Sequence, residues 1–276
     1  MRRLQTEFGD EVRITYVMGG LSRQYEGDQA RLVTEWLDAA ERSGMPVDPR
    51  AWNTPGAIKS TFPACMAFKA AAEQGPEAAE RYLRALREGI MCRRRKLDGV
   101  EALVEEARAA GLDAERFRVD VGSHAIVEAF GADLEETRGV PDEARTRGLV
   151  VQAPSGERLA LPALRFLGDR SGSPGSAGGS SGSPRPVGDG TERWCGANDG
   201  YEGWREAALA AGAVAASGSP PSVTGALERF GRLATPEIAS VCDLPGPRAQ
   251  ADLWRLATEW RLRPERFLTG ELWELA

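Results

Sequence analysis

The sequence predicts an α/β protein in which a large helical insertion interrupts the core and a small C-terminal winged-helix-like module follows it. Three observations predict this fold class. Alternating apolar positions indicate strands at residues 12–18, 149–161 and 163–167. Apolar side chains recur at helical spacing through residues 28–139. Beyond residue 221, short helical patterns precede a hairpin pattern.

The chain begins inside a helical pattern, because no N-cap residue or capping box stands ahead of residues 1–8. A strand pattern follows at residues 12–18, bounded by Gly9-Asp10 and Gly19-Gly20. The Gly19-Gly20 corner fits either a simple turn or a close approach of the backbone to another segment. Since a fold seldom opens halfway through a helix, we expect that the element preceding this helix is absent from the chain as given.

The helical insertion is expected to consist of short, closely connected helices. They should cover residues 28–43, 62–74, 76–95, 99–110, 114–121 and 124–138. Most of these patterns follow a polar residue that can cap a helix: Asp28, Ser60 or Thr61, Asp98, Asp113 and Ser123. Gly44 should stop the first helix, and Pro63 suits the first turn of the second.

After Pro141 the apolar period shortens from that of a helix to that of a strand. Strands at 149–151 and 159–161 should form a hairpin around a Pro154-Ser155-Gly156 turn. The remaining expected elements are strands at 163–167 and 192–195 and a helix at 201–211 with Trp204 and Leu209 inward.

Two segments are expected to lack regular structure. Residues 168–190 are rich in Gly, Ser and Pro and predict a flexible loop without core residues. Residues 213–221 predict a linker of small residues.

The last 55 residues, 222–276, predict a separate module of three helices and a hairpin wing. The helices should cover 223–230, 237–242 and 249–260, with the hairpin at 266–273. Arginines gather where a winged helix would meet DNA, at 255, 261, 263 and 266. However, this module holds seven Arg against eight Asp and Glu residues. We therefore expect a protein-docking or substrate-cap role and no nucleic-acid binding.

The composition is that of a globular protein, with 42% hydrophobic and 28% charged residues among 276. No apolar run approaches the roughly 20 residues of a membrane span, and no secretion signal is present. We therefore expect a cytoplasmic protein that does not bind membranes. The net charge of −6 argues against a surface that binds nucleic acid throughout.

The four cysteines form no C-x-x-C pair and show no zinc-like spacing, and there is one histidine, so no metal site is expected. Cys65, Cys195 and Cys242 are expected to be packed structural thiols. Cys92 precedes three arginines, which could lower its pKa, but an inert thiol is the preferred interpretation. His124 should be a surface residue in the first turn of a helix.

Four stretches of the sequence carry a family resemblance: Tyr16-Val17-Met18-Gly19-Gly20-Leu21, Ser60-Thr61-Phe62-Pro63-Ala64-Cys65, Tyr82-Leu83-Arg84-Ala85-Leu86-Arg87 and Leu112-Asp113-Ala114-Glu115-Arg116-Phe117. They resemble the long-chain DsbA-like proteins of the FrnE and YjbH type over residues 1–212. The resemblance implies an N-terminally truncated thioredoxin-like core at 1–27 and 140–212, with the helical insertion at 28–139.

The family's chemistry needs a C-x-x-C at the start of the first helix and a cis-proline in the facing loop. Pro162 matches that proline, and the resemblance implies a substrate-binding loop at Leu161, Pro162 and Ala163 that pairs with an extended peptide. The C-x-x-C and the first central strand are absent and are expected upstream of Met1. No bound cofactor is implied.

The resemblance predicts a thiol–disulfide oxidoreductase acting on cysteine-containing protein substrates, although this chain should lack dithiol activity. One alternative is a redox-inactive adaptor of the YjbH type, which would deliver a client protein for proteolysis. A further alternative is a glutathione-dependent isomerase of the same fold.

Overall fold

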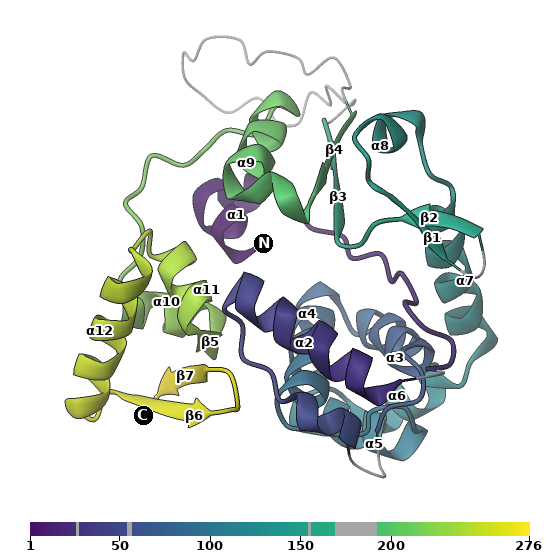
Figure 1. The fold of residues 1–276 in the computed structure, drawn as a ribbon, viewed down its shortest axis with the longest axis horizontal. Helices are drawn as coiled ribbons and strands as arrows, with labels where there is room; N and C mark the ends of the chain where they lie inside the picture. The colour runs from purple at the N-terminus through teal and green to yellow at the C-terminus, as the bar shows by residue number, and fades with distance from the viewer. Residues whose placement is uncertain (26–27, 54–56, 154–155, 169–191) are drawn as a thin grey trace. The chain divides into compact units, whose positions relative to one another are not determined.

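The computed structural model describes residues 1–25, 28–53, 57–153, 156–168 and 192–276 (Figure 1). The predicted loop at 168–190 lies almost wholly outside the described residues. The chain groups into two compact units, residues 1–17 with 135–219 and residues 18–134 with 220–276. The predicted domain boundaries stay a prediction.

The first unit holds short helices and two antiparallel sheets. Its helices are α1 (Arg2–Phe8), α8 (Asp142–Thr146) and α9 (Gly200–Ala210), and its strands are β1 (Val150–Ala153), β2 (Gly156–Leu159), β3 (Ala163–Leu167) and β4 (Glu192–Gly196). β1 pairs with β2, and β3 pairs with β4 with Leu164 opposite Cys195. A hairpin is therefore confirmed here, but β2 ends at Leu159, where the predicted second strand 159–161 begins. Gly156 belongs to β2, and Pro154 and Ser155 of the predicted turn lie outside the described residues. Both predicted strands of the second sheet are confirmed.

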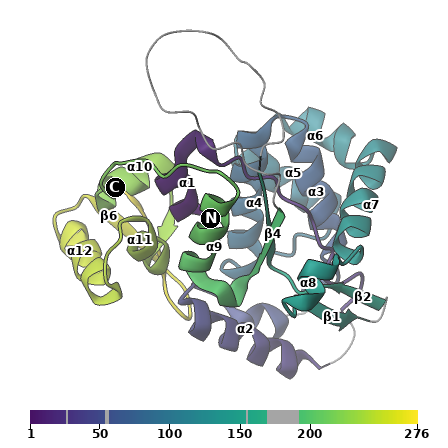
Figure 2. The ribbon, with the colours of Figure 1, turned by 90° about the horizontal axis from the view of Figure 1, so that it is seen from above.

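Two small apolar clusters hold this unit. One packs Leu4 and Phe8 of α1 against Ala208 of α9, which places α1 beside α9 in both ribbon views (Figures 1 and 2). The other joins Val140, Ala144, Leu159 and Trp194. Trp204 of α9 packs on the first cluster as predicted, but Leu209 is 39% exposed, and the small Ala207 and Ala208 take the inward positions.

The predicted strand at residues 12–18 is wrong. Val12 has extended backbone angles, φ −119° and ψ 112°, yet residues 12–18 belong to no strand. Alternating side chains alone do not make a strand, because the backbone groups need a neighbouring ladder. Among the described residues, no strand pairs with this segment.

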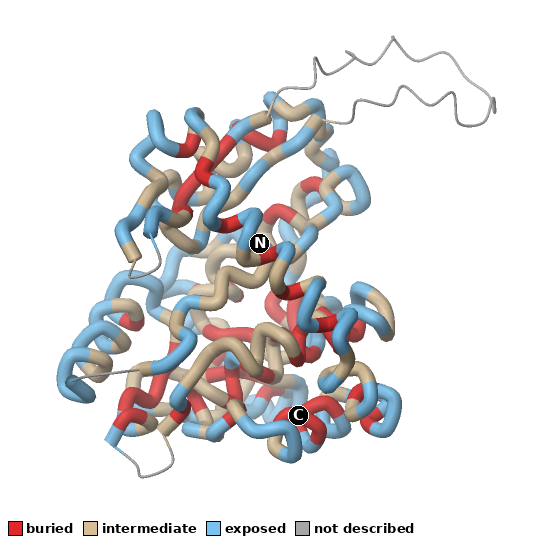
Figure 3. The backbone as a smooth tube through the Cα atoms, turned by 90° about the vertical axis from the view of Figure 1, so that its right-hand side faces the viewer, coloured by how far each residue is buried: buried red, intermediate tan, exposed pale blue. Residues whose placement is uncertain are grey.

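The helical block of the second unit matches the predicted helices closely. It comprises α2 (Gln29–Ser43), α3 (Phe62–Ala72), α4 (Pro76–Met91), α5 (Val100–Ala109), α6 (Ala114–Val121) and α7 (His124–Arg138), with a 3-10 turn at Pro49–Asn53. The last residues of α7, from 135 on, are counted with the first unit. Its core gathers Tyr82, Leu103, Phe117 and Ile126, and the buried stretches of these helices are red in Figure 3. The Tyr82 hydroxyl donates to the Leu103 carbonyl at 2.9 Å, so the one polar atom of this aromatic core is paired.

Most predicted caps are confirmed. Asp28, Asp113 and Ser123 accept hydrogen bonds from backbone N–H groups in the first turns of α2, α6 and α7. Asp98 does not cap α5, which starts after Gly99; its carboxylate accepts instead from the Lys59 N–H at 2.8 Å. This bond ties the chain before α3 to the start of α5.

The C-terminal module has the element order and sheet of a winged helix. It comprises α10 (Val223–Phe230), β5 (Leu233–Ala234), α11 (Thr235–Val241), α12 (Gly246–Thr258), β6 (Leu262–Arg266) and β7 (Glu271–Leu275), with strand order β5-β7-β6. The short β5 was not predicted, and the hairpin strands lie outward of the predicted 266–273. Leu253 and Trp273 are fully buried at the centre of its core.

No helix within the described residues is both long enough and apolar enough to cross a bilayer.

Candidate functional site

The predicted substrate-binding loop connects β2 to β3. The Leu161–Pro162 peptide bond is cis, as predicted. Leu161 and Ala163 pack on the cluster around Trp194, and Ala160 N–H donates to the Leu149 carbonyl at 3.0 Å. Pro162 itself is exposed. The loop is thus fixed on both sides while its proline ring faces solvent.

The strand after this loop has one strand neighbour. β3 pairs only with β4 among the described residues, so its other edge has no strand partner there. Leu167 at the end of β3 is 60% exposed. An edge of this kind can accept an extended peptide as an added strand.

The cysteines are poorly suited to thiol chemistry. All four are free, and Cys92, Cys195 and Cys242 are buried while Cys65 is half-buried. Burial raises the pKa of Cys65, Cys92 and Cys242 to about 11 each, and burial also raises the pKa of Cys195. With their pKa raised in this way, the thiols are nearly all protonated at neutral pH. A protonated thiol is a poor nucleophile, because the thiolate is the reactive form. The burial and raised pKa of Cys92 agree with the predicted inert thiol, which stays a prediction.

The remaining predicted residue of chemical interest, His124, is exposed at the first position of α7, as predicted. Within the described residues, no group of His, Cys, Asp or Glu side chains is arranged to hold a metal ion.

A buried ion network joins α4 to the C-terminal module inside the second unit. Glu88, only 7% exposed, accepts from Arg93 at 3.0 Å, from Arg232 at 2.9 Å and from Arg84. Arg84 also donates two hydrogen bonds to the Glu237 carboxylate, at 2.8 and 2.9 Å. Burial works against the ionised form of Glu88, but the guanidinium groups around it hold its pKa below the ordinary value.

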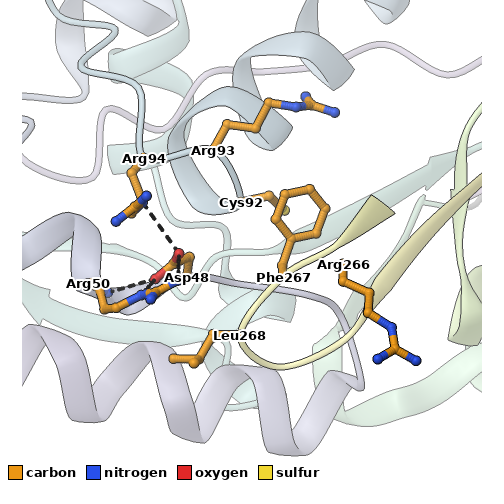
Figure 4. Close-up of a pocket in the computed structure, with 8 residues that line it drawn as sticks. All are labelled: Asp48, Arg50, Cys92, Arg93, Arg94, Arg266, Phe267 and Leu268. Carbon is orange, nitrogen blue, oxygen red and sulfur yellow. Dashed lines mark hydrogen bonds and ion pairs between the residues drawn. The ribbon is translucent and has the colours of Figure 1, made fainter. Parts of the chain in front are cut away.

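A pocket of about 520 Å³ opens beside this network (Figure 4). We call it the Arg50–Arg94 pocket, and it is lined by Asp48, Arg50, Cys92, Arg93, Arg94, Arg266, Phe267 and Leu268. The Asp48 carboxylate is buried and accepts from Arg50 Nε at 2.7 Å and Arg50 Nη2 at 2.6 Å. Arg94 Nε lies 3.4 Å from the same carboxylate. The hydrogen bonds from Arg50 hold the pKa of Asp48 below its ordinary value.

Only weak sequence signals point to this pocket. Arginines 93–95 stand out only as neighbours of Cys92, and Arg266 only as a residue of the wing. Asp48 and Arg50 are two positions apart, a spacing that suits a local ion pair, but nothing in the sequence places them beside the wing.

A family model described as Thioredoxin matches residues 1–140. The chain belongs to this thioredoxin family. Its predicted thioredoxin-like fold class is thereby confirmed, together with the mixed helical and strand architecture described above.

Curated relatives of this thioredoxin-family chain carry one common name. "ClpXP adapter protein SpxH" of Halalkalibacterium halodurans is 33% identical over 147 residues, which are 50% of this chain and 48% of the relative. The protein of that name from Shouchella clausii is 26% identical over 283 residues, 99% of this chain and 81% of the relative. The one from Bacillus subtilis is 32% identical over 105 residues, 38% of this chain and 35% of the relative. The chain thus spans about half of the first relative's length and more of the second.

Proposed function

We propose that this chain is a redox-inactive adaptor that binds a client protein and presents it to the ClpXP protease. The observation that carries the proposal is the similarity to curated proteins named ClpXP adapter, one of them aligned with 99% of the chain. We infer a chain of the YjbH type and, with a protease partner of this kind, a cytoplasmic location.

The thiols support the adaptor hypothesis over the oxidoreductase hypothesis. Dithiol exchange needs a paired, low-pKa thiolate, whereas the sequence has no C-x-x-C and burial raises the pKa of every cysteine. Binding a client requires none of this chemistry. The proposal therefore assigns no catalytic residue to the chain.

The loop at Leu161, Pro162 and Ala163 is the proposed client contact. Its proline is exposed and it leads into the edge strand β3. We propose that an extended client segment adds to β3, where backbone hydrogen bonds supply affinity with little demand on client sequence.

The experiment begins with protein turnover in the host. The half-lives of cellular proteins are compared between the wild type, a strain lacking this gene and a strain lacking ClpX. A client should be stabilised in both mutant strains. Its degradation by purified ClpXP should then accelerate several-fold when the purified 276-residue chain is added.

A variant with alanine at all four cysteines is the matched control. The adaptor hypothesis expects this variant to stimulate degradation as the wild type does. Stimulation that disappears with the cysteines, or reduction of insulin disulfides by the purified wild-type chain, would contradict the proposal in favour of thiol chemistry.

Amide hydrogen exchange tests the proposed contact. Adding the client should slow exchange in β3 (163–167), while α6 (114–121), in the helical block, should exchange unchanged. Unchanged exchange in β3 with saturating client would assign the contact to another surface.

A further inference from the structure

The Arg50–Arg94 pocket is built from three segments of the second unit that are fixed to one another. The Val47 N–H donates to Thr269 Oγ1 at 2.7 Å, which ties the turn of the wing to the loop before Asp48. The Asp48 N–H donates to the Met91 carbonyl at 2.7 Å. The Cys92 thiol donates to the Pro46 carbonyl at 3.1 Å. A site held this way needs little ordering when a ligand binds.

The charges inside the pocket are unequal. Arg50 and Arg94 both point toward the single carboxylate of Asp48 (Figure 4), and their side chains are 57% and 45% exposed. One buried carboxylate balances only one of these two guanidinium groups. The two groups therefore keep a positive charge and N–H donors at the pocket surface, which suits a second carboxylate.

The other two arginines are committed elsewhere. Arg93 binds Glu265 with bonds of 3.0 and 2.6 Å, and the Arg266 guanidinium lies 5.0 Å from the centre of the Trp254 ring. Both point away from Asp48 in Figure 4. The proposed ligand contacts therefore come from Arg50 and Arg94 alone.

The backbone at Arg94 has φ 55°, in the left-handed region that favours glycine. Local strain of this kind persists where the surroundings fix the conformation, and it recurs at binding sites. At this position the chain carries an arginine whose guanidinium completes the pocket.

An apolar wall stands beside the charges. The Phe267 ring lies over Cys92 in Figure 4, and Leu268 next to it is 52% exposed. An inorganic anion would use only the guanidinium groups, whereas a peptide could place a carboxylate on them and an apolar side chain on this wall.

We propose that the Arg50–Arg94 pocket binds an acidic segment of a partner protein, with a carboxylate on Arg50 and Arg94 and a neighbouring apolar side chain on Phe267 and Leu268. The inference rests on the proposed function only for the kind of partner, a protein. Its test contains no protease, so either hypothesis can fail while the other stands.

The probe is an array of immobilised decapeptides in which the numbers of Glu and Leu residues vary independently. The full chain should bind more strongly as Glu is added, and more strongly again when Leu stands beside Glu. Arg94→Gly removes the guanidinium at a backbone position that suits glycine, so it should fold normally and bind roughly fivefold more weakly.

Two further variants separate the parts of the pocket. Leu268→Ser should abolish the gain from Leu and keep the gain from Glu. Arg248→Gln is the matched control for Arg94→Gly, since Arg248 is an exposed, ion-paired arginine of the same unit. It should bind as the wild type. Melting temperatures of all variants report whether each has folded.

Three results would overturn the proposal. The first is the same Glu dependence in wild type and Arg94→Gly. The second is an equal loss in Arg248→Gln, which would indicate general attraction by arginines. The third is complete displacement of the peptides by inorganic phosphate with no effect of Leu, which would make the pocket a site for small anions.

Discussion

Glu88 shows how much a single buried side chain contributes to the second unit. It is enclosed by three guanidinium groups, with donors at 2.9 and 3.0 Å from Arg232 and Arg93. Glu88→Gln keeps the shape but removes the charge from these buried, charge-assisted hydrogen bonds, while each arginine keeps one other carboxylate: Glu237, Glu265 or Glu274. We expect a loss of about 3 kcal/mol in the free energy of unfolding at neutral pH, measured by urea titration.

The same variant should also change the pH dependence of stability. The pKa of Glu88 is lowered on folding, from an ordinary value of 4.5. Its contribution is therefore fully present above that value and is lost as the pH falls through the lower folded pKa. The gap between wild type and Glu88→Gln should narrow in acid. The control is Glu35→Gln, at an exposed pair with Arg31, which should shift stability by no more than about 0.5 kcal/mol. If the stability difference between wild type and Glu88→Gln widened in acid, the lowered pKa of Glu88 would be contradicted.

Substitutions at two tryptophans of the C-terminal module should affect stability very differently. Trp273 is fully buried, donates to Thr235 Oγ1 at 2.9 Å and meets Trp254 edge-on. Trp260 is 89% exposed and has φ 58°. Trp273→Ala should cost about 3–5 kcal/mol, whereas Trp260→Gly should leave stability unchanged or raise it by up to about 1 kcal/mol. Thermal melts of both variants decide this, and a large loss in Trp260→Gly would mean that its ring is packed.

At the scale of elements, Gly20 controls how the segment after residue 18 meets the helical block. A Cβ at this position would lie 2.7 Å from Leu134 Cδ2 and 3.0 Å from both Phe130 and Phe62. Asp133 fixes the same segment by accepting from the Met18 N–H at 2.8 Å and from Lys69 at 2.9 Å. The sequence left open a turn or a close approach at Gly19-Gly20, and the close approach is confirmed.

Gly20→Ala should therefore destabilise the chain by about 2–3 kcal/mol, because overpacking adds to backbone strain. Gly44→Ala is the matched control: Gly44 has φ +66° and ψ 4°, in the left-handed helical region, and an added Cβ would meet Pro236 only at an ordinary contact distance of 3.5 Å. It should lose only about 1 kcal/mol from strain. Equal losses in chemical unfolding would show that contact with Leu134 and its neighbours contributes nothing.

Helices were predictable here, whereas the strand at 12–18 was not. A helix satisfies its own backbone groups, so local signs such as Asp28, Asp113 and Ser123 fix its start. A strand depends on a partner strand that can lie anywhere in the chain, and the segment 12–18 has no partner strand among the described residues. The exposed loop at Pro162 was found from a resemblance, while the pocket depends on residues 48, 94 and 267 coming together, which no local pattern reveals.

At the scale of the whole molecule, the helical block and the C-terminal module belong to one compact unit. Arg84 to Glu237, Arg93 to Glu265 and Glu88 to Arg232 cross between them. Leu272 also packs against Cys92 in a small shared apolar cluster. One partner of each ion pair comes from α4 or from the residues directly after it. α4 therefore makes the main contacts that join the helical block to the C-terminal module.

Removing residues 220–276 should therefore loosen α4 rather than leave an intact helical block. The truncation would remove Arg232, which pairs with Glu88, and also Glu237 and Glu265, which pair with Arg84 and Arg93. Buried charges would then lack part of their counter-charge. We expect amide exchange in α4 (76–91) to accelerate by at least about tenfold, since each lost 1.4 kcal/mol of local opening energy is a factor of ten. Exchange in α9 (200–210), which belongs to the first unit, should stay unchanged. If α4 kept its full protection in the shortened chain, the ionic network would be a surface of contact between two independently stable bodies, and the predicted separate module would be the better description.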